Sequence, residues 1–297
     1  MDNMQKIPVF FTFDANYLLA AKVAIHSMMK HASRQYWYEL YVFHTTLSPK
    51  AQQSLRNSLK EFTHTELHFI DVTQYNEKIK NFGTKAHYSK EIFYKLIATD
   101  VLPQYDRIIC SDVDVVFTGD FSPVFFMFPN EKFYYASVGP VENSRMPYYR
   151  KDFSTTEMEI LEHEIAAGFL LINLKELRND HKQEEIINFY VNNYPRLRLP
   201  EQDCIILTCW PYIKYLPIDY SLPISFYRLN MNQRDFYQGN TEFAGDKATA
   251  LAKFNKGLAH PVQIHYAGFD KPWNCFRLTR RQDWIKAMKS TPGGMVL

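Results

Sequence analysis

Glycine is scarce in this chain, which has only 10 glycines among 297 residues. None is spaced as GxGxxG or GxxxxGK[ST], so neither of these phosphate-binding loops can hold a nucleotide here. The four cysteines form no Cys-x-x-Cys pair, which predicts reduced thiols in a cytoplasmic protein. No run reaches the about 18 apolar residues of a membrane-spanning helix, and the first residues lack the pattern of a secretory signal.

Net charge is also small, because 34 basic residues nearly balance 32 acidic ones and leave a formal charge of +2. We therefore expect no nucleic-acid partner. Hydrophobic residues make up 46% and charged residues 22%, a globular composition. Aromatic residues are plentiful, with 20 Tyr and 23 Phe. They can stack on a base or a sugar ring, or pack between a sheet and its helices.

Short apolar segments alternate with helical patterns along the first third of the chain. Strands are predicted at residues 8–13, 39–44, 65–70 and 107–110, with helices over 17–30 and 49–62 and from 89 onward. This alternation predicts right-handed βαβ units and a mostly parallel sheet. Further along, we expect an irregular loop over 139–160, a buried strand at 168–173 and a helix at 184–190. Ligands of such sheets bind beyond the carboxyl ends of the strands.

The sequence Asp112-Val113-Asp114 directly follows the fourth predicted strand. Side chains at i and i+2 of an extended chain share a face, and two neighbouring carboxylates repel unless a cation or a proton lies between them. The pair predicts a divalent metal site, although two surface aspartates in a turn would look the same. The nucleophile motif of haloacid-dehalogenase-type phosphatases is a weaker match, because Ser111 interrupts its apolar run and no later Gly-Asp…Asp pair follows.

His265, which follows a predicted strand at 262–264, is the candidate third metal ligand. An imidazole beside carboxylates suits Mn²⁺ better than Mg²⁺, and a hard cation completes its shell with phosphate oxygens and water. A lone histidine is more often structural, so spacing alone leaves this pairing open.

Six segments in series resemble glycosyltransferase family 8, the group that contains bacterial lipopolysaccharide galactosyl- and glucosyltransferases and glycogenin. The resemblance runs from about residue 8 to residue 273. The segments are Thr12–Tyr17, His87–Leu96, Asp112–Asp114, Ala167–Asn173, Glu201–Asp203 and His265–Trp273.

This resemblance implies a glycosyltransferase A-type fold, which is a Rossmann-like α/β nucleotide-sugar-binding fold with a mixed, mostly parallel central sheet. Residues 1–270 would form the catalytic domain and residues 271–297 a basic C-terminal extension. The implied activity is transfer of a hexose, glucose or galactose, from a UDP-sugar to a saccharide acceptor with retention of configuration. The acceptor would be lipopolysaccharide or another surface glycan, and the metal Mn²⁺, with Mg²⁺ as the alternative. A non-catalytic relative that binds a nucleotide sugar or a glycan is the competing hypothesis.

The resemblance also assigns roles to residues. Metal ligands that also contact the donor are expected at Asp112, Asp114 and His265. Lys271 and Lys95, the latter at a position where many members have arginine, are expected near the donor phosphates. Gln202 would lie near the anomeric carbon and Glu201 at sugar or acceptor hydroxyls. The remaining donor-binding residues are Thr12, Asp14, Asn16, Tyr17, Val113 and Gly268.

Three departures from the family pattern fall on sugar-facing positions. Ala166 stands where an asparagine is usual, and Glu201 replaces an aspartate. An acidic residue often found just after Gly139 is absent, and Glu142 is a candidate substitute. The donor sugar is therefore the least determined part of the predicted transfer.

The C-terminal 27 residues are strongly basic. From Lys271 to Leu297 six basic residues oppose one acid, Asp283, which gives +5 and leaves −3 for the rest of the chain. The interleaved apolar residues are Phe276, Trp284, Ile285 and Met288. This segment predicts either peripheral contact with the inner face of an anionic membrane or a C-terminal helix packed on the domain.

Overall fold

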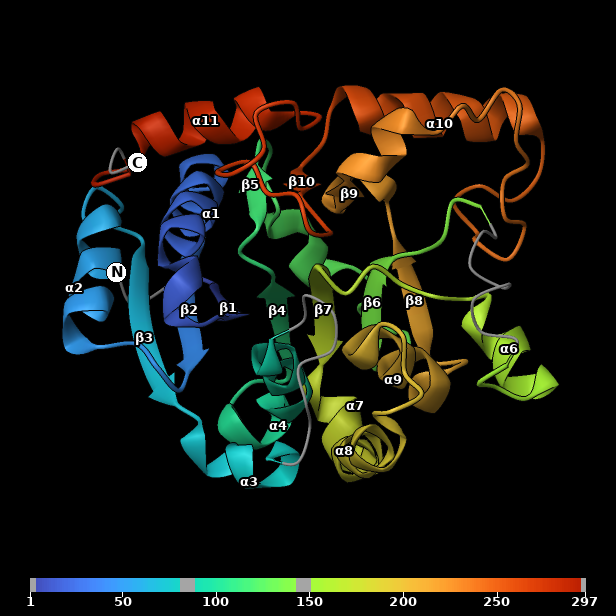
Figure 1. The fold of residues 1–297 in the computed structure, drawn as a ribbon, viewed down its shortest axis with the longest axis horizontal. Coiled ribbons are helices and arrows are strands. Elements are labelled where there is room, and N and C mark those ends of the chain that lie inside the picture. Colours follow the sequence, from blue (N-terminus) through green and yellow to red (C-terminus); the bar gives the residue numbers. More distant parts are fainter. Residues whose placement is uncertain (1–3, 81–88, 143–150, 295–297) are drawn as a thin grey trace.

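The computed structural model describes residues 4–80, 89–142 and 151–294, and a seven-stranded sheet forms its centre (Figure 1). The strand order is β3-β2-β1-β4-β7-β6-β8. Strand β7 is antiparallel to both of its neighbours, and every other pair is parallel. The mixed, mostly parallel sheet predicted above is confirmed. The strands are β1 (Lys6–Thr12), β2 (Trp37–His44), β3 (Thr65–Asp71), β4 (Arg107–Ser111), β6 (Tyr135–Val138), β7 (Phe169–Asn173) and β8 (Ile213–Leu216).

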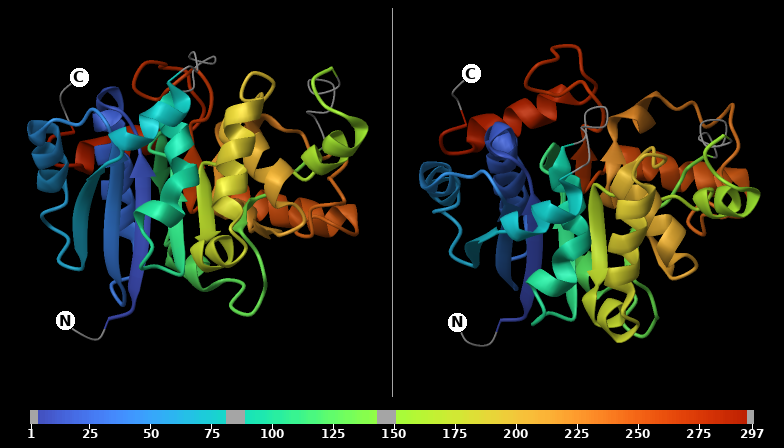
Figure 2. Two further views of the ribbon diagram at one scale, coloured as in Figure 1. Left: turned by 90° about the horizontal axis from the view of Figure 1, so that it is seen from below. Right: turned by 60° about the horizontal axis from the view of Figure 1, so that its bottom comes forward.

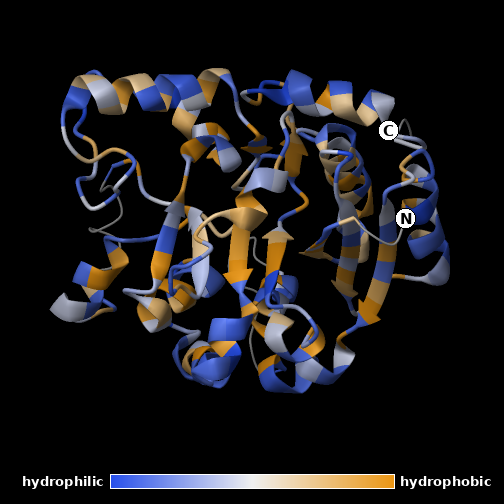
Figure 3. Ribbon diagram, turned by 180° about the vertical axis from the view of Figure 1, so that it is seen from behind, coloured by the Kyte–Doolittle hydropathy of each residue, from blue (hydrophilic) through white to orange (hydrophobic). Residues whose placement is uncertain are grey.

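Helices cover both faces of this sheet (Figure 2). Val9 and Phe11 of β1 share a core with α1 (Leu18–His31) and α2 (Pro49–Ser58), whereas Phe10 packs on the other face with the 3₁₀ helix η3 (Lys90–Ile97). Strands buried on both faces are mainly apolar, and the middle of the sheet is mainly orange in Figure 3, whereas the outer strands also carry blue segments. Other helices are α3 (Asn76–Ile79), α4 (Ala98–Val101), α7 (Leu174–Asn179), α8 (Lys182–Asn193) and α9 (Pro200–Cys209).

A second, three-stranded sheet joins distant parts of the chain. It consists of β5 (Val115–Phe117), β10 (Gln263–His265) and β9 (Leu222–Pro223), in the order β5-β10-β9. Strand β10 is antiparallel to β5, and their register sets His265 opposite Val115. The residue after the Asp112–Asp114 pair is thereby held beside the predicted third ligand.

Helix starts were predicted at two capping serines, Ser48 and Ser89, and only the first makes the capping hydrogen bond. Pro49 begins α2, and the Ser48 hydroxyl accepts a hydrogen bond from the Ala51 N–H at 3.2 Å, as predicted. Ser89 makes no such bond, and the helix expected after it is the tighter 3₁₀ type followed by α4. The short 3₁₀ helices elsewhere are η1 (Ala15–Tyr17), η2 (Thr73–Tyr75), η4 (Ser122–Phe126), η5 (Ile218–Tyr220) and η6 (Ile224–Arg228).

The loop expected over 139–160 is only partly a loop. Residues 143–150 lie outside the described residues, as do His87 and Tyr88. Helix α6 (Thr155–Leu161) begins within the segment, with a capping box between Ser154 and Glu157. This Ser-x-x-Glu signature was visible in the sequence.

The C-terminal region forms α10 (Lys247–Ala259) and α11 (Arg281–Ser290), which lie along the top of Figure 1. Helix α11 packs on α1 with Trp284 fully buried, and the Lys22 ammonium donates to the Gly293 carbonyl at 2.7 Å. The packed C-terminal helix is thus present, whereas Phe276, just before it, is 84% exposed. Among the described residues, we find no helix with the length and apolar character needed to cross a bilayer.

Candidate active site

A cavity of about 550 Å³ opens at the carboxyl ends of β1 and β4, beside the small sheet. The start of β7 lies at the same edge because that strand runs the opposite way. Asn16 and Lys95 do not contribute to the cavity wall. The predicted site residues that do line it are Thr12, Asp14, Tyr17, Asp112, Val113, Asp114, Glu201, Gln202, His265, Gly268 and Lys271.

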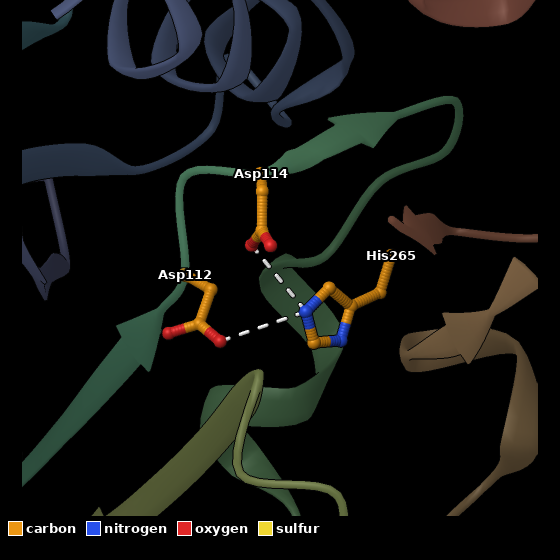
Figure 4. Close-up of side chains that lie close together, drawn as sticks. All are labelled: Asp112, Asp114 and His265. Carbon is orange, nitrogen blue, oxygen red and sulfur yellow. Dashed lines mark ion pairs between the residues drawn. The ribbon is translucent and has the colours of Figure 1, made fainter. Parts of the chain in front are cut away.

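Asp112, Asp114 and His265 converge on one point of this wall (Figure 4). Asp112 follows β4, Asp114 precedes β5, and His265 ends β10. The His265 Nε2 atom lies 3.6 Å from Asp112 Oδ2 and 3.3 Å from Asp114 Oδ1. One ligand atom from each residue falls within 4.8 Å of the other two, so a single metal ion can contact all three.

Two lysines balance the charge of these carboxylates. Lys95 Nζ lies 2.6 Å from Asp112 Oδ1, and Lys271 Nζ lies 2.6 Å from Asp114 Oδ2. Each aspartate therefore gives one oxygen to an ammonium and presents the other to His265. Burial disfavours the ionised Asp114, but His265 and Lys271 hold the pKa of its carboxyl below the usual range. The Asp114 carboxylate is thus favoured in the charged form that a metal ligand needs.

The donor set and its surroundings fit a metal of the manganese type. Two carboxylates and one imidazole are ligands that Mn²⁺ accepts. The His265 Nδ1 atom is buried and has no hydrogen-bond partner among the described residues, so only Nε2 is engaged. A Cβ at Gly168 would lie 2.5 Å from the imidazole ring. Glycine at 168 therefore leaves the space in which the ring turns toward the aspartates.

Lys95 lies behind the cavity wall, although the sequence analysis expected it near the donor phosphates. Its ammonium contacts Asp112, Glu201 Oε1 at 3.1 Å and the Ala167 carbonyl at 3.0 Å, which occupies all three N–H bonds. Burial lowers the pKa of Lys95, and the two carboxylates outweigh burial and raise it. Lys95 thus fixes an aspartate of the metal site and Glu201 in one arrangement.

Glu201 and Gln202 lie in the first turn of α9, which begins at Pro200. Glu201 is 6% exposed, and its Oε2 is buried without a partner in the described structure. Since an unpaired buried carboxylate oxygen is costly, this atom is available to a donor from a bound molecule. Gln202 Oε1 accepts from the Ala167 N–H at 3.4 Å. Asp203 instead caps the helix start, accepting from the Arg198 and Leu199 N–H groups.

The opposite side of the cavity carries the first motif. Asp14 caps η1 by accepting from the Asn16 N–H at 2.8 Å, and Asn16 itself is exposed. The Thr12 hydroxyl donates to the Glu91 carbonyl at 2.9 Å. The Tyr17 ring meets Trp273 edge-on at 5.7 Å between centroids, and burial raises the pKa of its hydroxyl. Tyr17 thus presents an aromatic surface near Lys271.

Part of the wall was missed by the sequence analysis. Phe226 and Leu229 line the cavity from η6 and the residues after it, where no motif marks them. Glu142, which was considered as a substitute acid, also lines the wall and pairs with Arg234 at 2.5 and 2.7 Å. No local pattern links positions 142 and 234, so only the folded chain reveals this pair.

Comparison with known proteins identifies the family. The model of glycosyl transferase family 8 matches residues 8–276. The chain belongs to this family. Two relatives of this family 8 chain are each 22% identical to it and matched over 92% of it: a lipopolysaccharide 1,2-glucosyltransferase of Escherichia coli and the glycosyltransferase GlyF of Streptococcus pneumoniae serotype 4. The matches cover 75% of the first relative and 59% of the second.

Solved structures agree on the fold. The galactosyltransferase LgtC, crystallised with donor and acceptor sugar analogues, matches 96% of both chains with a TM-score of 0.70 and 16% identity. The bifunctional glycosyltransferase WbbM matches 98% of this chain with a TM-score of 0.74 and 22% identity, but this chain spans only 51% of WbbM. The family 8 chain therefore has the glycosyltransferase A-type fold, and family membership removes the phosphatase alternative.

Proposed function

We propose that this family 8 glycosyltransferase moves a hexose, glucose or galactose, from a UDP-sugar to a saccharide acceptor with retention of configuration. The observation that carries the proposal is the convergence of Asp112, Asp114 and His265 in a cavity that also holds Tyr17 and Glu201. Lipopolysaccharide or another surface glycan is the proposed acceptor, because the relatives include a lipopolysaccharide glucosyltransferase.

A bound Mn²⁺, or Mg²⁺ in its place, would supply positive charge to the diphosphate as the sugar leaves. Asp112, Asp114 and His265 would hold it. Lys271, whose ammonium already reaches the metal site, would stabilise the charge that develops on the leaving phosphate.

The remaining residues would position the donor. Tyr17 presents its ring for stacking on uracil, with Thr12, Asp14, Asn16, Val113 and Gly268 around the nucleotide. The free Glu201 oxygen would accept a hydrogen bond from a sugar hydroxyl, and Gln202 would lie at the anomeric carbon. Lys95 would act indirectly by holding Asp112 and Glu201 in place.

A panel of UDP-sugars tests the proposal. We expect Mn²⁺-dependent hydrolysis of UDP-glucose or UDP-galactose without acceptor, with the released sugar retaining its anomeric configuration by NMR. Calorimetry should show UDP binding that strengthens with Mn²⁺ and weakens in Tyr17→Ala, whereas Tyr212→Ala, at a 41% exposed tyrosine, should bind as the wild type does. Binding of UDP-sugars without any turnover would favour the non-catalytic alternative, and equal affinity for GDP would refute uracil recognition.

We also propose a cytoplasmic enzyme that contacts the inner face of the membrane through the start of its basic extension, residues 271–297. Phe276 is 84% exposed, and the Arg281 guanidinium lies 4.8 Å from its ring centroid. Truncation near residue 275 would remove the buried Trp284, so Phe276→Ser with Arg277→Ser is the cleaner test. Loss of retention on anionic vesicles would support the contact, and unchanged retention would contradict it.

A further inference from the structure

A second cavity, of about 470 Å³, lies at the far end of the β5–β10 pair from the metal ligands. Its walls come from the end of α1, the end of β5, the segment 259–262 before β10, and one face of α11. In Figure 1, α11 and α10 follow one another along the top, above β5 and β10. No residue of the proposed transfer site lines this cavity.

Its ionisable side chains are almost all basic. Lys30, His31, His260, Arg280 and Lys286 line it, with Asp283 as its single carboxylate. Arg280 already pairs with that aspartate, with its Nε atom 2.7 Å from Asp283 Oδ2 and its Nη2 atom 3.1 Å from Asp283 Oδ1. Its Nη1 atom donates to the Tyr227 hydroxyl. In the described parts of the chain, no carboxylate pairs with Lys30 or Lys286.

The two lysines act on the neighbouring His31. Burial first, and then Lys30 and Lys286, lower the pKa of His31. Asp120 opposes this effect, but its carboxylate already accepts from the Ser33 N–H and from the N–H and hydroxyl of Ser122. Positive groups from α1 and α11 therefore face a common space, the nearby carboxylates of Asp120 and Asp283 already have hydrogen-bond partners, and an anion placed between the two lysines would reduce their repulsion.

We propose that this cavity binds a phosphate group, carried either by a small soluble phosphate compound or by a lipid headgroup. A phosphate has several acceptor oxygens, which match two ammonium groups and the ring N–H groups of His31 and His260. Arg280 and Asp283, which pair with each other, would lie in the cavity wall beside the phosphate and add no net charge. The site is independent of the proposed transfer chemistry.

The first test uses inorganic phosphate and the full-length chain treated with EDTA. The imidazole resonances of His31 and His260, followed by NMR, should shift at millimolar phosphate in a saturable manner. Lys30→Glu combined with Lys286→Glu should weaken this binding at least about tenfold, because two charge-assisted contacts are lost. Lys30→Gln with Lys286→Gln should have an intermediate effect, and unchanged circular dichroism should show that both variants are folded.

Lys60→Glu with Lys289→Glu is the matched control, since both lysines are exposed and neither lines the cavity, although Lys289 belongs to α11. It changes the net charge equally and should bind as the wild type does. A second arm measures retention on phosphatidylglycerol vesicles against phosphatidylcholine vesicles. Phosphate binding without lysine-dependent vesicle retention identifies a soluble ligand. Retention lost only in the Lys30/Lys286 variant identifies a headgroup.

Two results would overturn the proposal. One is the absence of both a saturable imidazole shift and a vesicle retention that depends on Lys30 and Lys286. The other is an equal loss in the test variant and in the Lys60/Lys289 control, which would reduce the effect to overall charge.

Discussion

Two partly buried groups of acidic side chains in this molecule differ in the charges around them. At the active site, Asp112 and Asp114 each lie 2.6 Å from a lysine ammonium. Beneath α10, Glu242 accepts from the Ile218 N–H at 3.1 Å, but its other oxygen is buried without a partner in the described structure. Burial raises the pKa of Glu242 to about 7, and the nearby Asp219 adds to the shift. The fold thus favours the ionised form of Asp114 and the protonated form of Glu242.

A carboxylate that can bind a metal differs from one that takes up a proton in the charges that surround it. Desolvation acts on both groups, and at the active site Lys95 and Lys271 offset it through direct contacts with the carboxylates, whereas Glu242 makes no ion pair among the described residues. Substitutions at the active site should therefore change activity. Substitution of Glu242 should instead change how the free energy of unfolding depends on pH.

The largest effect is expected for Asp114→Asn, which keeps the shape but removes the charge. Transfer should fall by at least about 10³-fold, because the metal that balances the leaving diphosphate would lose a ligand. Asp112→Asn should behave similarly. Mn²⁺ binding by electron paramagnetic resonance and donor turnover measure this, with Asp235→Asn as a control at a 99% exposed side chain. Full activity of the variants in excess EDTA would exclude a metal from the reaction.

Lys271→Met should lower turnover and strengthen metal binding. Removing the ammonium should lower kcat by about 10²-fold, since charge on the leaving phosphate is less well stabilised. In the absence of nucleotide, Mn²⁺ should bind more tightly, because the ammonium no longer competes for Asp114. Titrations with and without UDP measure both, and Lys50→Met, at an exposed position, should change neither. Parallel weakening of both properties would contradict the proposed competition.

A smaller effect is expected for Gly168→Ala. The new Cβ would lie 2.5 Å from the His265 ring, so the imidazole must move away from the aspartates. Mn²⁺ affinity should fall by about 10–100-fold, as is usual when the support of a metal ligand is disturbed. Metal titration and a thermal melt distinguish this from unfolding. An unchanged metal affinity would show that the ring has space to adjust.

The smallest effect is expected for Glu242→Gln, in stability rather than activity. Between its ordinary pKa of 4.5 and about 7, folded Glu242 holds a proton that the unfolded chain has released. The free energy of unfolding should therefore fall as pH rises through this range, by up to about 3 kcal/mol. Denaturant titrations at several pH values should show a flatter profile in Glu242→Gln. An identical profile would place the proton elsewhere, and exposed Glu159→Gln is the control.

Much of the sheet could be predicted from the sequence, because local patterns determine it. Buried strands are continuous apolar runs, and the Ser48-Pro49 start of α2 carries its own cap. The 3₁₀ form of residues 90–97 was missed because the apolar spacing of Ile92, Phe93 and Leu96 does not separate a 3₁₀ helix from an α-helix.

The candidate site, too, could be predicted only in part from the sequence. Motif spacing suggested Asp112, Asp114 and His265, and the structure brings them together. The position of Lys95 behind the wall and the space that Gly168 leaves depend on contacts between residues far apart in the chain. Such contacts follow from packing of whole elements, which no window of sequence contains.

The order of the strands along the chain has one more consequence. The seven-stranded sheet is complete once β8 ends at Leu216, but His265 arrives only with β10 and Lys271 still later. During synthesis, the N-terminal part of a chain leaves the ribosome before the rest. When β8 has left the ribosome, all strands of the seven-stranded sheet have been translated, but His265 and Lys271 have not. The proposed site can therefore form only after residues 263–271 have been translated.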